Sequence, residues 1–446
     1  MDDFLARLAR RLTELERAHA PMGVAVAYSG GLDSTVLLAA CRRLDLSLPV
    51  RALHVDHGLH AESGRWARHC ADIARSLDVE LRSLRISVSP GGGQSLEAVA
   101  RERRYAALAE MLEPREMLLT AHHADDQLET VLMRLFRGAG VRGLRGILES
   151  GPFATGFIGR PLLAFGRAEL RAVAITWQLD CLEDPANRDL RFDRNYVRSV
   201  VAPAIAARWP GVARTVTGTA ARMAEAEDLL DALAVLDAGE LSDPARVPAA
   251  MLRGLAVPRQ RNLLRHLLTR CRLPLPSARQ LDELVAALAV ERRDAQARVH
   301  WPGAEARVYG GYLYLMAELL PPSSTGEGGM LGPCTPWIGP EGRLELCEAS
   351  SAGTPAALPE TWIDAGLSVR FRTGGERLRL RGHHRELKKL LQEARVVPWM
   401  RSRIPLLFRE GELVAVGDLW VADPAEAEGR AGRAWRVRWT EHPPLY

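Results

Sequence analysis

The chain has 446 residues, about three times the length of a typical domain, so two or three domains are expected, each long enough to bury a core. Hydrophobic residues make up 47% of the chain and charged residues 26%, as in ordinary globular proteins, and the net charge is only +4. Six scattered cysteines form no C-x-x-C pair, which argues against a zinc ribbon or an iron–sulfur site and favours reduced thiols.

The start of the chain is charged throughout and repeats apolar residues at helical spacing, which predicts an amphipathic helix. It contains no apolar segment of the kind that a signal peptide needs. The chain has no uninterrupted apolar run of membrane-spanning length. A cytoplasmic protein without a membrane partner is therefore expected.

Strand-like and helical patterns alternate over the first 200 residues. Short β-rich runs predict strands at 23–29, 50–57, 79–86 and 117–123. Helical patterns lie between or after them, at 34–44, 95–112 and about 125–137. This alternation predicts an α/β fold with a doubly wound parallel sheet, whose ligands bind at the carboxyl ends of the strands.

The rest of the chain divides by composition. Residues 209–320 are mostly helical and end in a hairpin pattern at 298–316. A stretch rich in Pro, Ser and Gly at 321–335 is typical of a linker. We therefore expect an α/β domain at 1–208, a mostly helical domain at 209–320, and a small α+β domain at 336–446.

The stretch YSGGLDST follows the first predicted strand and opens a helix. Its glycines allow close backbone approach, and a helix N-terminus favours an anion, so the loop is suited to phosphate. A Walker loop is excluded, because it needs a lysine and the chain has none before Lys388. The acidic Asp33 in a phosphate site suggests a bridging Mg²⁺. The residues expected to contact the nucleotide here are Ser29, Gly30, Gly31, Leu32, Asp33 and Ser34.

A second group of polar residues, in AHHADDQLETVLMRLF, lies where the fourth strand is predicted to end. Asp126 and Glu129 are three residues apart and share a helical face, where two carboxylates could hold an ammonium group or accept a proton. With His122 and His123 they also suggest a metal cluster, although the spacing is not H-E-x-x-H. Asp125 is expected to cap the helix.

Two further stretches allow two interpretations each. His54, Asp56 and His57 end the second strand, where they could form a metal set or simply alternate between core and solvent; we favour a place at the rim of the phosphate site. The segment 181–205 carries several arginines, which could contact phosphates or form a solvated helix face.

Basic charge is concentrated near the C-terminus. Residues 369–403 contain eleven Lys and Arg against three Asp and Glu, or +8, so the rest of the chain sums to −4. This charge indicates either a surface that binds a polyanion or a solvated helix face. A helix from about His384 would place Lys388, Gln392 and Arg395 on one face, where they could contact an RNA backbone.

The SGGLDS core resembles the pyrophosphate-binding loop of the PP-loop (N-type) ATP pyrophosphatases, a Rossmann-like family that cleaves ATP between its α and β phosphates. Further motifs, taken together, resemble the tRNA(Ile)-lysidine synthetase family. They are SGGLDS, HVDHGL, SLEAVARERRY, AHHADDQLETVLMRLFRGAGVRGL, EDPANRDLRFDRNYVR and the segment 371–422, which contains LKKLLQE. Their order and separation make the resemblance specific.

The resemblance implies that ATP adenylates the wobble cytidine of tRNA(Ile) with a CAU anticodon, and that L-lysine then displaces AMP to form lysidine. It implies ATP and Mg²⁺ as cofactors, Asp33 as the metal ligand, and tRNA binding by the domain at 336–446; a homodimer is compatible with it. The implied catalytic residues are Asp33, His122, Asp126, Glu129, Arg104 and Arg194. His54 and Asp56 are expected to contact the nucleotide together with the residues of the phosphate loop. The implied tRNA contacts are Arg101, Arg137, Arg160, Asn195, Lys388, Lys389 and Arg395.

Two alternatives stay open at this point. A tRNA thiolase of the same superfamily would share HVDHGL, but thiolases that carry clusters need C-x-x-C pairs, which the chain lacks. A non-catalytic RNA-binding protein with the same fold would be expected to have lost Asp33 or the two carboxylates, and all three are present.

Overall fold

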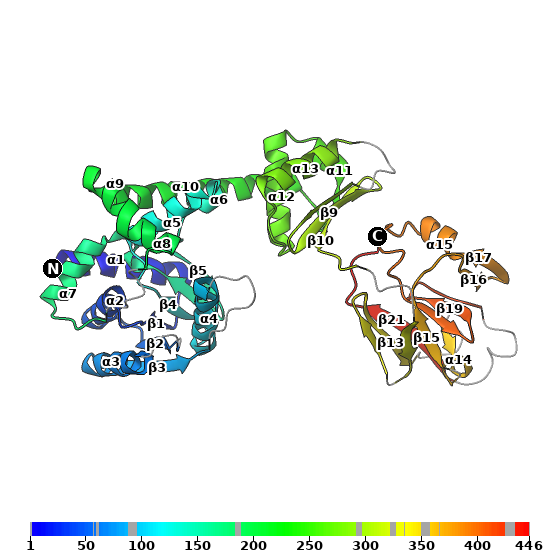
Figure 1. The fold of residues 1–446 in the computed structure, drawn as a ribbon, viewed down its shortest axis with the longest axis horizontal. Helices are drawn as coiled ribbons and strands as arrows, with labels where there is room; N and C mark the ends of the chain where they lie inside the picture. The colour runs from blue at the N-terminus through cyan, green and yellow to red at the C-terminus, as the bar shows by residue number, and fades with distance from the viewer. Residues whose placement is uncertain are drawn as a thin grey trace. The chain divides into compact units, whose positions relative to one another are not determined.

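The structure is a computed structural model of the chain. It describes residues 2–56, 58, 62–87, 96–182, 189–290, 297–321, 327–333, 335–348, 357–364, 366–423 and 433–445. The chain divides into two compact units, Met1–Leu230 and Asp231–Tyr446, with the long helix α10 (Val212–Ala238) running through the division (Figure 1). The domain boundaries expected from composition stay predictions. Within the described ranges, no helix combines the length and apolar character needed to cross a membrane.

The first unit is built on a six-stranded sheet with the order β3-β2-β1-β4-β6-β5. Its neighbouring strands are parallel except for β5, which runs antiparallel to β6. The strands are β1 (Gly23–Ala27), β2 (Val50–Asp56), β3 (Glu80–Arg85), β4 (Glu116–Leu119), β5 (Ser150–Phe153) and β6 (Gly156–Gly159). This sheet confirms the predicted α/β fold. The strand order reverses between β1 and β4, which is where sheets of this kind bind ligands.

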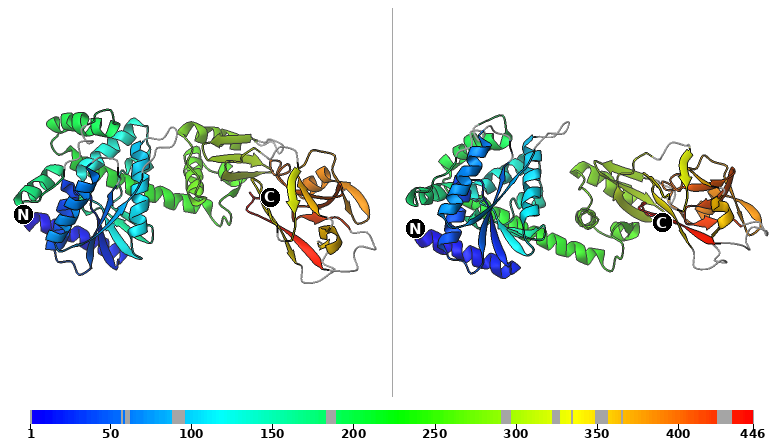
Figure 2. Two further views of the ribbon diagram at one scale, coloured as in Figure 1. Left: turned by 60° about the horizontal axis from the view of Figure 1, so that its bottom comes forward. Right: turned by 90° about the horizontal axis from the view of Figure 1, so that it is seen from below.

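Helices cover both faces of this sheet (Figures 1 and 2). On one face, α1 and α2 bury Leu8 and Leu37 in a core that includes Val24 of β1. On the other face, α4 buries Leu108 in a core that includes Ala25, as expected for a strand whose side chains alternate between faces. The helices are α1 (Asp2–His19), α2 (Leu32–Arg43), α3 (Ser63–Ser76), α4 (Leu96–Met111), α5 (Ala124–Phe136), α6 (Val141–Leu144) and α7 (Arg167–Thr176).

The end of β4 differs from the prediction. The strand was expected to reach residue 123, but it ends at Leu119, where its partner β6 ends at Gly159. The next four residues therefore form a separate connection to α5. Further along the chain come the short helix η1 (Pro161–Ala164), α8 (Asp193–Tyr196), the π-helical turn η3 (Val197–Val201) and α9 (Ala202–Arg208). Such π turns are rare and are often found at functional sites.

The first part of the second unit combines three helices with a sheet of order β7-β10-β9-β8. The predicted hairpin at 298–316 is present, but it is two successive hairpins. Gly303 turns β8 into β9 with a φ of +82°, and Gly310 and Gly311, also at positive φ, turn β9 into β10. The elements are β7 (Arg246–Pro248), α11 (Ala249–Arg253), α12 (Val257–Arg270), α13 (Ala278–Ala289), β8 (Ala297–Trp301), β9 (Ala304–Tyr309) and β10 (Tyr312–Ala317).

The last part of the second unit has two larger sheets, of orders β11-β15-β18-β19-β20 and β12-β13-β21-β14, and the hairpin β16-β17. Residues 327–331, which composition assigns to a linker, form β11 because they pair with β15. The elements are β11 (Glu327–Leu331), β12 (Trp337–Gly339), β13 (Gly342–Glu348), β14 (Leu358–Pro359), α14 (Glu360–Asp364), β15 (Leu367–Arg370), β16 (Arg377–Leu380), β17 (His383–Glu386), α15 (Leu387–Glu393), β18 (Leu406–Arg409), β19 (Glu412–Val416), β20 (Trp420–Val421) and β21 (Ala434–Thr440).

The basic segment folds differently from the prediction. A helix was expected from about His384, but that residue lies in β17, and α15 begins only at Leu387. The cause is a turn at Gly382, whose φ of +76° lets β17 fold back on β16. Arg395 lies beyond the end of α15 with a φ of +56°, so the expectation that it shares a helix face with Lys388 is wrong.

Candidate active site

The predicted phosphate loop joins β1 to α2, and its backbone leaves no room for a side chain at Gly30. This residue has a φ of +79°, and a Cβ atom there would lie 2.8 Å from Cys70 Sγ and 2.9 Å from Leu182 Cδ1. The Leu182 N–H donates to the Gly30 carbonyl at 2.9 Å. Gly31 is the N-cap of α2 and has no side chain to compete for the first N–H groups of the helix, which favours an external anion.

The hydroxyl groups of the loop mainly brace its own backbone. Ser34 Oγ donates to the Gly31 carbonyl at 3.0 Å, and Thr35 Oγ1 donates to the same carbonyl at 2.9 Å. Ser34 and Thr35 are buried, whereas Ser29 is exposed and lies 3.0 Å from Ser34 Oγ. The surface open to a phosphate therefore consists of backbone N–H groups and Ser29, with Ser34 supporting the loop from within.

The two residues predicted at the rim support turns of the chain. His54 is buried, and its Nδ1 lies 2.9 Å from the carbonyl of Tyr28, at the base of the phosphate loop. Asp56 Oδ1 accepts the N–H of Gly58 at 2.9 Å. His54 thus fixes the loop from the neighbouring strand. His57, considered with them from the sequence, lies outside the described residues.

Helix α5 begins with a reciprocal cap made by a histidine. His123 is the N-cap: its Nδ1 accepts the N–H of Asp126 at 3.4 Å, and Asp126 Oδ2 accepts the N–H of His123 at 3.1 Å. The expectation that Asp125 caps the helix is therefore wrong. Asp125 instead accepts the backbone N–H of Arg167, at the start of α7, at 2.8 Å.

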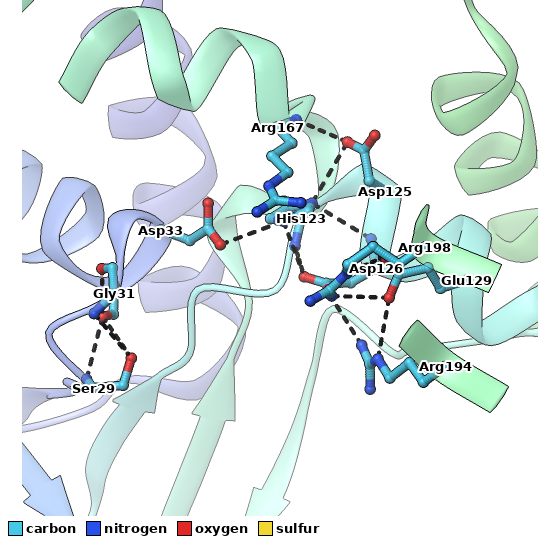
Figure 3. A network of polar contacts seen from close by, with 11 residues as sticks. Ser29, Gly31, Asp33, His123, Asp125, Asp126, Glu129, Arg167, Arg194 and Arg198 are labelled. Carbon is cyan, nitrogen blue, oxygen red and sulfur yellow. Dashed lines mark hydrogen bonds and ion pairs between the residues drawn. The ribbon is translucent and has the colours of Figure 1, made fainter. Parts of the chain in front are cut away.

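Asp126 and Glu129 face Arg194 of α8 and Arg198 of η3 (Figure 3). Arg198 Nε donates to Glu129 Oε1 at 2.6 Å, and its Nη2 donates to Asp126 Oδ1 at 2.8 Å and to Glu129 Oε2 at 2.9 Å. Arg194 Nη2 donates to Asp126 Oδ1 at 3.0 Å, and its Nε donates to Glu129 Oε2 at 3.1 Å. The Glu129 side chain is only 2% exposed. We call these four residues the carboxylate–arginine cluster.

The cluster keeps Asp126 ionised. Burial alone would raise the pKa of Asp126, but the charge of His123, that of His122 where it is protonated at low pH, and the charges of Arg194 and Arg198 outweigh burial and lower that pKa to about 2. An ionised, buried carboxylate pair is suited to binding a cation, since charge-assisted hydrogen bonds are the strong ones.

His123 connects the cluster to the phosphate loop (Figure 3). Its Nε2 lies 3.5 Å from Asp33 Oδ2 and 3.4 Å from Asp126 Oδ2. Burial would lower the pKa of His123, but Asp125, Asp33 and Asp126 outweigh it and raise the pKa to about 10. Near pH 7 the ring is therefore charged and Nδ1 carries a proton that faces Asp125 Oδ2 at 3.6 Å, so Nδ1 can accept the Asp126 N–H only in the neutral ring.

His122 differs from its neighbour. Its Nδ1 lies 2.8 Å from Thr120 Oγ1. Burial, reinforced by the charges of Arg160, Arg101 and Arg194, lowers the pKa of His122 to about 3 despite the opposing charge of Asp126. The ring is therefore neutral near pH 7 and can donate or accept one hydrogen bond without adding charge.

Three predicted arginines gather around the ring of Tyr105. The guanidinium groups of Arg101 and Arg104 lie 5.1 Å and 5.6 Å from the ring centroid, and Arg160 Nη1 donates to the Leu148 carbonyl at 2.6 Å. Burial lowers the pKa of both Arg104 and Arg160. Among the described residues, no ion pair joins these arginines to a carboxylate, so the group is suited to an anion.

Arg137 and Asn195 hold the segment that carries the two cluster arginines. Arg137 Nη2, at the end of α5, lies 3.5 Å from Asp193 Oδ2 at the start of α8. Asn195 Nδ2 donates to the carbonyl of Asp189 at 3.0 Å. Both residues, predicted as tRNA contacts, therefore have local structural partners here.

The three basic residues predicted near the C-terminus belong to the second unit. Lys388 and Lys389 lie on α15, Arg395 follows it, and all three are exposed. Lys389 Nζ lies 3.4 Å from Glu386 Oε2. The helix buries its three leucines, so its cations point away from the core, as the pattern indicates.

Two members of this site were missed as site residues from the sequence. His123 was weighed only as a metal ligand, and Arg198 only as one arginine of a basic segment. The signal for Arg198 was its spacing of four from Arg194, which places both on one face of a helical turn. The signal for His123 was its position directly before α5, where a side chain that accepts a hydrogen bond can cap the helix.

The described residues contain no group of three or more His, Cys, Asp or Glu side chains arranged to hold a metal ion. Asp33 Oδ1 is buried and has no hydrogen-bond partner among the described residues. One such carboxylate oxygen fits an ion that takes its remaining ligands from phosphates and water, as Mg²⁺ commonly does.

Comparison with known proteins agrees with this geometry. Family models match residues 4–205 (PP-loop domain), 248–314 (TilS substrate binding domain) and 367–439 (TilS substrate C-terminal domain). The tRNA(Ile)-lysidine synthase of Alkalilimnicola ehrlichii is 40% identical over 420 residues, which cover 93% of this chain and 93% of that protein. The enzymes of the same name from Methylococcus capsulatus and Pseudomonas aeruginosa are each 39% identical, covering 89% and 94% of this chain and 92% and 93% of their own lengths.

These matches span nearly the whole chain and include the loop, the carboxylate–arginine cluster and α15. They confirm the resemblance drawn from the motifs, and the PP-loop domain supports ATP as a substrate. The cluster-bearing thiolase and the non-catalytic RNA-binding protein are correspondingly disfavoured. The chain belongs to the tRNA(Ile)-lysidine synthase family.

Proposed function

We propose that this chain ligates L-lysine to carbon 2 of the wobble cytidine of tRNA(Ile) with a CAU anticodon, and that it uses ATP and releases AMP and pyrophosphate. The observation that carries the proposal is the carboxylate pair of Asp126 and Glu129, which binds two cationic side chains and is joined to the phosphate loop by His123. Acceptors of this kind suit an ammonium group held beside ATP. The printed names of the relatives support the tRNA substrate.

In the first proposed step, the cytosine O2 attacks the α-phosphorus of ATP. The bond from that phosphorus to the oxygen bridging to the β-phosphate breaks, and pyrophosphate leaves. The poor leaving group O2 becomes part of an AMP ester. Backbone N–H groups of the loop hold the departing pyrophosphate, and Arg104 and Arg194 offset the charge that develops. A Mg²⁺ ion bound through Asp33 would add further positive charge there.

In the second proposed step, lysine displaces AMP. The ordinary pKa of a lysine ammonium is about 10.4, so the group must lose a proton before its nitrogen can attack carbon 2. The carboxylate pair of Asp126 and Glu129 first binds the ammonium, and one of the two then accepts that proton. The new C–N bond forms as the C2–O2 bond breaks, and AMP carries O2 away. The nitrogen then loses its second proton to water, which gives lysidine.

The remaining basic residues are proposed to hold the tRNA. Arg101 and Arg160, beside Tyr105, lie in the first unit with the carboxylate–arginine cluster and suit an RNA phosphate. Lys388, Lys389 and Arg395 in the second unit supply exposed cations for a second stretch of RNA backbone.

The proposal is tested with ATP, labelled lysine and tRNA(Ile) transcribed with a CAU anticodon. The expected result is one lysine incorporated per tRNA, with AMP and pyrophosphate released in equal amounts. The same tRNA with uridine at the wobble position is the control and should take up no lysine. Absence of incorporation with the CAU tRNA, or sulfur transfer instead, would overturn the proposal.

A further inference from the structure

All four oxygens of the carboxylate pair already accept hydrogen bonds. Asp126 Oδ1 binds both arginines and Asp126 Oδ2 binds the N–H of His123. Glu129 Oε1 binds Arg198, and Glu129 Oε2 binds both arginines. The two positive charges of the arginines balance the two carboxylates. Asp126 Oδ1 and Glu129 Oε2 each accept two hydrogen bonds from the arginines, so a lysine ammonium that binds between these two oxygens must replace an arginine.

The two arginines are not held equally. Arg198 makes three hydrogen bonds of 2.6 to 2.9 Å, whereas Arg194 makes two, of 3.0 and 3.1 Å. Arg194 also lies near other cations. The pKa of Arg104 is lowered first by burial and then by the charges of Arg101 and Arg194. Burial would lower the pKa of Arg198, but Glu129, Asp126 and Asp33 outweigh burial and raise it. Arg194 is thus the arginine that dissociates from the two carboxylates more easily.

A bound nucleotide offers Arg194 another partner. The triphosphate brings several negative charges to the loop, which the short contacts through Asp33 and His123 connect to the cluster. Guanidinium groups bind phosphate oxygens as readily as carboxylates. Without nucleotide, Arg194 is balanced by the carboxylates. With nucleotide, phosphate and carboxylate compete for it.

We propose that nucleotide binding draws Arg194 off the carboxylates and that the lysine ammonium takes its place on Asp126 Oδ1 and Glu129 Oε2. Arg198 stays and acts as a positioning residue that keeps the two carboxylates together. An ammonium group has three N–H donors, so it can fill both of the acceptors that Arg194 vacates. This inference rests on the proposed function, and it adds an order: the site accepts an amine only after ATP has arrived.

The exchange predicts that lysine and nucleotide bind cooperatively. Lysine binding to the full chain is measured by calorimetry with and without α,β-methylene-ATP and Mg²⁺, because the methylene group prevents cleavage between the α and β phosphates. The lysine affinity should rise with the nucleotide by about 5- to 150-fold, the usual range of coupling between sites. By reciprocity, lysine should tighten nucleotide binding by the same factor.

Variants separate the exchange from a structural role. Arg194→Ala should bind lysine without nucleotide more tightly than wild type, because the two acceptors are already free, and nucleotide should add little. A structural role for Arg194 would weaken lysine binding instead. Arg191→Ala is the matched control: Arg191 lies on the same segment, is 87% exposed and pairs with Asp189. It should show the wild-type coupling.

Equal lysine affinity with and without nucleotide would overturn the exchange, and so would weaker lysine binding by Arg194→Ala. Neither result would touch the proposed function if labelled lysine still entered the tRNA. Conversely, tight lysine binding that depends on nucleotide, but without incorporation into the CAU tRNA, would support the exchange while the reaction assigned to the site fails. The two proposals can therefore fail separately.

Discussion

Replacing Glu129 by glutamine tests the carboxylate pair most directly. The Glu129 side chain is 2% exposed and accepts three hydrogen bonds from arginine nitrogens, at 2.6, 2.9 and 3.1 Å. The glutamine NH₂ group would face guanidinium donors, so only one oxygen would remain as an acceptor. A hydrogen bond to a charged group contributes about 1.5 to 3 kcal/mol. The amide loses one bond if its NH₂ replaces Oε1 and two if it replaces Oε2. With the offset by water, because the arginines are 24% exposed, this predicts a loss of about 1.5 to 4 kcal/mol.

Glu116→Gln is the matched control for this loss. Glu116 is also buried and binds Arg51 through both of its oxygens, at 2.7 and 2.6 Å, but it lies at the first residue of β4, and the carboxylate pair follows the other end of that strand. Urea unfolding of the full chain should show that both variants are destabilised by comparable amounts. Both changes remove one buried carboxylate that binds arginine.

The two variants should differ in lysine transfer. In single-turnover assays with saturating ATP and tRNA, Glu129→Gln should transfer lysine at least about 100-fold more slowly, which corresponds to about 2.7 kcal/mol. Glu116→Gln should react at the wild-type rate at a temperature where it is folded. Binding of tRNA, measured by filter retention, should be unchanged in both. Transfer by Glu129→Gln within a factor of two of wild type would refute the role of the pair.

Three further predictions follow from other contacts. Gly30→Ala places a Cβ atom 2.8 Å from Cys70 Sγ at a φ of +79°, so pyrophosphate release should fall at least about tenfold at fixed ATP, as measured by a coupled phosphate assay. Lys388→Ala combined with Lys389→Ala should weaken tRNA binding and flatten its dependence on salt in titrations from low to high ionic strength; an unchanged slope would leave α15 without RNA contact. Asp126 has a pKa of about 2 in the folded chain against 3.8 ordinarily, so its ionised form stabilises the fold above pH 4 by about 2 kcal/mol. That contribution should disappear as the pH falls towards 2, and the unfolding curves of wild type and Asp126→Asn should converge there.

The main architecture was predictable because its signals are local. The first sheet follows from short β-rich runs that alternate with helical patterns, and each predicted strand of this sheet is present within a few residues. The exception, the end of β4 at Leu119, depends on where its neighbour β6 stops. The neighbour lies about 40 residues away in sequence, so no local pattern marks that end.

The hairpin β16-β17 was missed because the positive charge of its sequence was given more weight than its strand pattern. Leucines alternate with arginines in RLRL, and Gly382 marks the turn, so the pattern of a hairpin was present. The density of positive charge drew the interpretation towards a basic helix that begins three residues too early. The helix signal of LKKLLQE was correct, and only its start was wrong.

The carboxylate–arginine cluster was only partly predictable. The spacing of Asp126 and Glu129 reveals that they share a face, but not what they face. Arg194 and Arg198 are more than 60 residues away, and their approach depends on the tertiary packing of α5 against α8 and η3. The opposite pKa shifts of His122 and His123 were likewise hidden, because they arise from burial and from charges brought together by the fold.

The two adjacent lysines of α15 also make this chain open to selective chemistry. The sequence contains no other lysine, and its arginines carry guanidinium groups. Guanidinium groups do not react with the mild acylating reagents that modify amines. A dye carried by such a reagent would therefore settle on one exposed helix turn and on the α-amino group, without any engineered cysteine. Fluorescence from that turn would report when RNA reaches α15. Prior acylation would cancel the two positive charges there without any change in the gene.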